Sequence, residues 1–134
     1  MKNVTHSDSC SVANVLGEVR VSVTFRGTHT GSFRVEVDGN PVQPNADGTV
    51  TVGTATTLKG ASVLIVTVVN QVGPTKFFEL DYVMQGTLCG PFTVQDTFDD
   101  GDPNATVRET IRFEGVVSRR SASPRKRSRK RPRR

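Results

Sequence analysis

Residues 18 to 26 alternate without exception between polar and apolar side chains, and this pattern constrains the fold more than any other feature of the chain. A β-strand points successive side chains to opposite faces, so a period of two places all the apolar members on one side. These members are Val19, Val21, Val23 and Phe25, and the polar members are Glu18, Arg20, Ser22, Thr24 and Arg26. The segment is therefore predicted to be a half-buried strand, with one face on the core and the other in water.

Residues 32 to 38 repeat the pattern, because Phe33, Val35 and Val37 alternate with charged side chains. Only residues 27 to 31 separate this segment from the first, and that gap has the length of a turn. Two alternating segments joined by a turn are typical of a β-hairpin. We therefore predict that the two segments pair with each other.

The rest of the chain predicts further short strands. Gly, Asn and Asp at residues 38–41 and 45–48 tolerate the backbone conformations of tight turns, so both stretches should reverse the chain. Residues 62–69 are a nearly continuous apolar run rich in Val, which is typical of a strand covered on both faces and predicts a central strand. Other strands are predicted around Val42 and at residues 49–52, 76–84, 92–98 and 106–117.

No segment has apolar residues at the three- and four-residue spacing of a helix, so the chain is predicted to be all-β. The expected fold is an antiparallel two-sheet sandwich, of immunoglobulin-like or jelly-roll type, with about seven to eight short strands. A small β-barrel is the alternative. We expect a polar N-terminal arm at residues 1–15, the β-sandwich domain at 16–117 and a disordered Arg-rich tail at 118–134.

Cys10 and Cys89 are the only cysteines, and they lack the paired spacing of a zinc site. We expect two unpaired thiols in a reducing compartment, with a disulfide between them as the alternative in an oxidising one. Residues 1–11 lack the apolar stretch of a signal peptide, and the apolar run at 61–69 is too short to cross a bilayer. A soluble protein that is not secreted through a signal peptide and does not insert into a membrane is therefore expected.

Candidate catalytic and metal-binding residues are few. The chain has two histidines, His6 and His29, and no set of His and Cys at the spacing of a metal site. It also lacks a Gly-x-Ser-x-Gly elbow, a Gly-rich phosphate loop and a cysteine with an evident histidine partner. We therefore predict a non-enzymatic protein with no metal, no cofactor and no small-molecule substrate.

Four aspartates cluster in a predicted loop near the end of the domain: Asp96, Asp99, Asp100 and Asp102. Closely spaced carboxylates can bind Ca²⁺, but this spacing does not match that of an EF-hand loop. A solvated turn is the favoured interpretation. A second hypothesis is that the basic tail docks on this loop, because the loop and the tail flank the same final strand.

Phe77 and Val83 are predicted to lie on the face of their strand that points away from the core. Apolar side chains in that position need a second cover, since large exposed apolar patches generally mark interaction sites. The cover is either another part of the same chain or a second protein. We therefore predict Phe77 and Val83 as interface residues of a homo-oligomer or a larger protein assembly.

The basic charge of the chain is concentrated at its C-terminal end. Residues 119–134 hold ten of the eighteen Lys and Arg and no acid, whereas the upstream part has eight basic against thirteen acidic residues. Such a block of like charges cannot bury enough apolar surface to order itself. The predicted nucleic-acid-binding residues are Arg119, Arg120, Arg125, Lys126, Arg127, Arg129, Lys130, Arg131, Arg133 and Arg134.

Eight of these ten side chains are arginines, whose planar guanidinium suits two-pronged contact with phosphate, so the predicted partner is the phosphate backbone of nucleic acid without sequence preference. In composition, the arginine tail punctuated by Ser and Pro is similar to the genome-binding tails of some viral structural proteins. We therefore predict a structural or assembly protein of a virion, or another nucleic-acid-associated protein. The alternative is a protein-interaction module whose tail, through residues 125–127 and 129–131, is a nuclear localisation signal. The two functions place the protein in a virion or in a nucleus.

Overall fold

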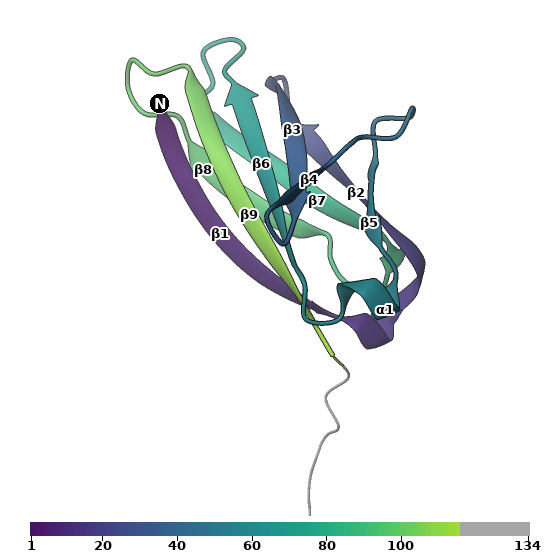
Figure 1. Cartoon of the computed structure of the whole chain (residues 1–134). Coiled ribbons are helices and arrows are strands. Elements are labelled where there is room, and N and C mark those ends of the chain that lie inside the picture. Colours follow the sequence, from purple (N-terminus) through teal and green to yellow (C-terminus); the bar gives the residue numbers. More distant parts are fainter. Residues whose placement is uncertain (116–134) are drawn as a thin grey trace, which may run out of the picture.

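The computed structural model describes residues 1–115, in which two β-sheets pack face to face as a sandwich (Figure 1). The elements are β1 (Lys2–Ser11), the 3-10 helix η1 (Val12–Asn14), β2 (Val15–Arg26), β3 (Thr30–Val37), β4 (Asn40–Val42), β5 (Val50–Gly53), α1 (Ala55–Leu58), β6 (Ser62–Asn70), β7 (Phe77–Thr87), β8 (Phe92–Thr97) and β9 (Asn104–Glu114). One sheet has the strand order β1-β9-β6-β3-β4, and the other has the order β5-β2-β7-β8.

The predicted all-β sandwich is confirmed, with nine strands in residues 1–115. The core lies between the sheets and takes the apolar side of each alternating pattern. On β2 the inward side chains Val19 and Val21 are fully buried, and on β7 the alternate residues from Phe78 to Met84 are buried in the same way. Burial of these apolar faces is the main stabilising contribution to such a fold. Within residues 1–115, neither helix is long or apolar enough to cross a membrane.

β6 is the central strand of the five-stranded sheet, as predicted, and lies between β9 and β3. Its core-facing side chains, among them Val63 and Ile65, are fully buried. On its outer face Val66 is buried as well, whereas Leu64 and Val68 are half-buried. The apolar run therefore marks a strand that is covered completely on one face and partly on the other.

The predicted hairpin between β2 and β3 is wrong, because the two strands belong to different sheets. β2 pairs with β5 and β7, whereas β3 pairs with β4 and β6. The connection crosses the sandwich beside His29, a buried side chain whose Nδ1 accepts a hydrogen bond from the backbone N–H of Val72 at 3.0 Å. The Nε2 of His29 donates to the carbonyl oxygen of Phe77 at 2.9 Å. His29 thus binds the β6–β7 connection and the start of β7 at the point where the chain passes between the sheets. The alternating pattern does not reveal these contacts.

Residues 1–15, expected as a polar arm, contain β1, an edge strand that runs parallel to β9 (Figure 1). The pairing extends from Lys2 opposite Ala105 to Ser11 opposite Glu114. The side chains of β1 that face inward are Lys2, Val4, His6, Asp8 and Cys10. Most of them are polar, so the alternation that marks the other strands is concealed here. The sandwich therefore begins at the start of the described chain.

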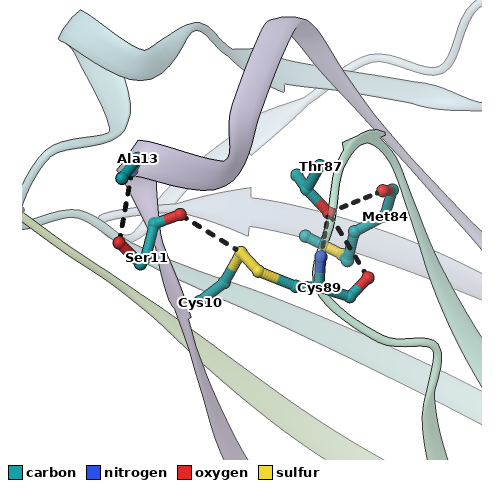
Figure 2. Close-up of a disulfide and its surroundings, with 6 residues drawn as sticks. All are labelled: Cys10, Ser11, Ala13, Met84, Thr87 and Cys89. Atoms are coloured by element: carbon teal, nitrogen blue, oxygen red, sulfur yellow. Dashed lines mark hydrogen bonds between the residues drawn. A yellow bond between two sulfur atoms is a disulfide. The ribbon is translucent and has the colours of Figure 1, made fainter.

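Cys10 and Cys89 form a disulfide, which corrects the expectation of two unpaired thiols (Figure 2). Their Cα atoms are 5.8 Å apart although 79 positions separate them in the sequence. Thr87 supports this site, because its Oγ1 accepts a hydrogen bond from the Cys89 N–H at 3.1 Å and donates one to the Met84 carbonyl at 2.9 Å. The bond joins β1 of one sheet to the segment that follows β7 of the other. The pairing of β1 with β9 and the packing of the two sheets bring the cysteines together, and sequence spacing shows neither.

Candidate functional site

The predicted nucleic-acid contacts are the ten basic side chains between residues 119 and 134, all of which lie outside the described residues 1–115. The described strand nearest to them in sequence is β9, which ends at Glu114. The candidate site described below therefore consists of residues on the sheet that contains β9, the last strand before these basic residues in sequence.

Three exposed arginines lie on the outer face of the five-stranded sheet: Arg34 on β3, and Arg108 and Arg112 on β9. The strand register places Arg34 and Arg108 opposite Val66 of β6, one on each side of it. Arg34 is paired with Glu36, while Arg108 and Arg112 have no ion pair within residues 1–115. These three residues, the sheet arginines, place positive charge on the sheet whose last strand leads into the tail.

Two members of the acidic cluster share one cation. The Nζ of Lys2 lies 2.9 Å from Asp96 Oδ1 and 3.4 Å from Asp99 Oδ1. Burial raises the pKa of Asp96, but the hydrogen bond from Lys2 and that from the Thr97 N–H outweigh burial and leave this pKa below its usual range. Asp96 and Asp99 are therefore paired with a lysine of β1, a partner that the sequence analysis did not consider.

The other two members of the cluster have cationic partners too. Asp100 is bound by the Nζ of Lys76, and Asp102 Oδ2 lies 2.8 Å from the amino group of Met1. Hydrogen bonds from these amines lower the pKa of both carboxyls. A tail docked on the loop would have to displace these cations. The contacts therefore favour the interpretation of the cluster as a turn whose carboxylates are paired within the domain. The hypothesis of tail docking stays untested, because the tail lies outside the described residues.

Phe77 and Val83 lie on the outer face of β7, as the alternation predicts, but the structure does not bring them together. Phe77 is 47% exposed, whereas Val83 is half-buried opposite Ser22 of β2. They are six positions apart along the strand, or about 20 Å at the rise of a β-strand. Asp81 lies between them and accepts a hydrogen bond from Arg26 at 2.5 Å. The two residues therefore do not form one apolar patch, and their role as an interface stays a prediction.

A cluster that the sequence analysis missed lies at the edge of the sandwich, where β1 meets β9. His6 of β1 stands opposite Glu109 of β9, and the His6 Nδ1 is 3.1 Å from Glu109 Oε1. The same nitrogen is 3.1 Å from Asp8 Oδ2. One signal for this cluster was present in the sequence, because Glu109 occupies a position of β9 whose alternate neighbours Val107 and Ile111 face the core.

Glu109 is a carboxyl group in the protein interior, with 0% of its residue surface exposed. Burial, together with the hydrogen bond and the negative charge of the nearby Asp8, raises its pKa to about 9. Burial also raises the pKa of Tyr82, and the negative charge of Glu109 acts in the same direction. The Tyr82 hydroxyl is hydrogen-bonded to Thr67 Oγ1 at 3.1 Å. The interior between β9, β6 and β7 therefore contains the carboxyl group of Glu109 and the hydroxyl groups of Thr67 and Tyr82 among its apolar side chains.

The chain matches none of the family models, curated proteins or solved structures with which it was compared. The residues of the chain itself are therefore the only guide to its function.

Proposed function

We propose that the protein is a non-enzymatic β-sandwich that takes part in assembly through its folded domain and holds nucleic acid through residues 119–134. The observation that carries this proposal is the separation of charge along the chain. The sixteen C-terminal residues contain ten basic side chains and no acid, whereas the preceding part has an excess of five acids. Contacts with phosphate groups provide most non-specific affinity for nucleic acid, and the Arg-rich tail is suited to them.

The folded domain restricts how the nucleic acid lies. Its acidic excess repels a polyanion, but the sheet arginines provide positive charge on the outer face of the sheet that contains β9, the last strand before the tail in sequence. Arg108 and Arg112 are close in sequence to Arg119, the first basic residue of the tail. We propose that the nucleic acid follows the tail and reaches the sheet arginines. The acidic cluster from Asp96 to Asp102 is then kept away from it.

The disulfide favours a virion structural protein over a module imported into a nucleus. Disulfides persist in oxidising surroundings, including virion surfaces, and are rare in nuclear proteins. The bond between Cys10 and Cys89 joins the two sheets and belongs to the folded domain itself. A tail that binds nucleic acid together with a disulfide-bonded domain fits a protein that packages a genome. Import by the same tail remains the second candidate.

The first test compares binding of fluorescent DNA and RNA by the full chain and by a variant that lacks residues 119–134. The variant is expected to fold, because the core lies within residues 1–115. We expect the full chain to bind both nucleic acids at low salt and the shortened chain to lose that binding. Equal binding by the two proteins would contradict the proposal. Failure of both to bind, with nuclear import lost on truncation, would favour the localisation signal.

A second experiment tests the sheet arginines in the full chain. The double variant Arg108→Ala and Arg112→Ala is expected to weaken binding and to reduce the salt slope of log affinity by roughly 1 to 2, given about 0.7 to 0.9 for each phosphate contact. Arg20→Ala is the matched control, since Arg20 is an exposed arginine of the other sheet. If the control and the double variant behave alike, the nucleic acid does not reach this face.

A further inference from the structure

We propose that His6, Asp8 and Glu109 form a binding site for a divalent transition-metal ion, with Zn²⁺ as the best-matched ion. The three side chains come from two adjacent strands, β1 and β9, and each offers one ligand atom. These atoms all lie within 4.8 Å of one another. The site is separate from the tail and from the sheet arginines, so it adds a binding function to the one proposed above.

The distances within the cluster fit a tetrahedral ion. The His6 Nδ1 lies 3.1 Å from an oxygen of Glu109 and 3.1 Å from an oxygen of Asp8. Zinc bonds to nitrogen and oxygen ligands are about 2.0 to 2.1 Å long, so neighbouring ligand atoms of a tetrahedral site are about 3.3 Å apart. Two of the three ligand separations are therefore close to those of a tetrahedral site, and the third is at most 4.8 Å.

The polar groups of the cluster are not fully satisfied by the protein. The Asp8 Oδ2 is buried and has no hydrogen bond within residues 1–115, although the His6 Nδ1 lies 3.1 Å from it. Glu109 itself is enclosed by the core. Glu109 is withdrawn from water and lies beside the carboxylate of Asp8, and two neighbouring carboxylates are costly unless a positive charge offsets them. A bound cation provides that charge and a partner for the orphaned oxygen.

The cluster is also accessible from solvent. The side chains of His6 and Asp8 are 40% and 26% exposed, whereas Glu109 forms the inner wall. His6 lines a hollow between the edge strands β1 and β8, together with Thr93 and Gln95. A four-coordinate ion held by these three protein ligands would take water in its fourth position. One imidazole and two carboxylates suit zinc, and the position of zinc in the affinity order above Mn²⁺ and Fe²⁺ supports that choice.

Neighbouring structure holds the ligands in place. Asp8 is two residues before Cys10, whose disulfide fixes the end of β1. The parallel register between β1 and β9 fixes His6 opposite Glu109. Since the ligands belong to strands of the sheet, an ion bound between them would also fasten the edge strand β1 to β9.

The test uses the full, disulfide-bonded chain, treated with chelator and then dialysed against ZnCl2. We expect one zinc ion per chain by elemental analysis and a raised melting temperature. Glu109→Gln is expected to weaken zinc affinity by roughly tenfold or more, since even outer partners of metal ligands have effects of this size. Glu114→Gln is the matched control, because it removes an exposed carboxylate from the same strand without touching the cluster.

Two further measurements make the result decisive. Glu109→Gln keeps the shape of the buried side chain, and circular dichroism will show that it folds. If the variant did not fold, His6→Gln, at a part-exposed position, would serve in its place. The Co²⁺-loaded wild type is expected to show the visible absorption of a tetrahedral site, which the variant should lack. The proposal is overturned if the folded wild type binds no zinc, or if Glu109→Gln binds zinc as tightly as the wild type.

Discussion

At the scale of single residues, the interior of this sandwich is unusual at one point. Glu109 lies where the pattern of β9 calls for an apolar side chain, and it faces Asp8 and His6. A buried acid is retained in a protein only at a cost, because its charged form is strongly disfavoured away from water. The cluster therefore departs from local folding rules in the way that functional sites often do.

Glu109→Gln is expected to stabilise the metal-free protein, because the amide has the same shape and, unlike the acid with its raised pKa, does not have to take up a proton on folding at pH 8. We expect the unfolding free energy at pH 8 to rise by about 1 to 2 kcal/mol, of the order of one unsatisfied buried polar group. Urea unfolding in the presence of chelator measures it. Glu114→Gln should change it little, and a loss of stability in Glu109→Gln beyond that control would contradict this account of the buried acid.

Asp81 is expected to make the unfolding free energy depend on pH in the acidic range. Burial raises its pKa, but hydrogen bonds from Arg26 and Thr93 outweigh burial and lower the pKa in the folded state. An aspartate whose pKa is lowered in the folded state stabilises the protein at pH values above its unfolded pKa. This contribution is lost as the pH falls through the folded pKa. Asp81→Asn should therefore cost about 1 kcal/mol at pH 7 and less near pH 2. Urea unfolding at both pH values checks this; an equal cost at both would contradict it.

At the scale of elements, alternation identified the strands that have one apolar face and failed for the strand that does not. The patterns of β2, β3 and β7 matched the residues that the core buries, and the apolar run of β6 marked the central strand. β1 was missed because His6 and Asp8 occupy its inward positions. The hairpin was predicted wrongly because a short gap does not show whether a chain turns within a sheet or crosses between sheets. The long-range contacts of His29 carry that information.

The disulfide is expected to hold β1 in the sandwich. Replacing Cys10 and Cys89 with serine should lower the unfolding free energy by about 2 to 5 kcal/mol, as for other native disulfides of small domains. Hydrogen exchange should become faster in β1 than in the central strand β6, because β1 is an edge strand with one neighbour. Denaturant unfolding and exchange of the reduced and oxidised proteins measure both effects. Unchanged stability and unchanged exchange in β1 would show that the bond has no such role.

At the scale of the whole molecule, the chain combines a folded domain with excess acid and a basic segment of opposite sign. The four carboxylates of the acidic cluster are paired with Lys2, Lys76 and the amino group of Met1, so each has a cationic partner within the domain. Of the proposed nucleic-acid site, the sequence alone indicated only the basic residues 119–134. The sheet arginines and the metal cluster depend on the register of β9 with its neighbours, which composition does not contain.

The most direct test of the central claim is the salt dependence of nucleic-acid binding by the full chain. If the tail neutralises about six to eight phosphates, log affinity should fall against log salt concentration with a slope of magnitude roughly 4 to 7. Binding should be equal for unrelated sequences, and removal of residues 119–134 should abolish detectable binding at low salt. Binding that is insensitive to salt, or a slope that survives removal of the tail, would contradict the proposed function.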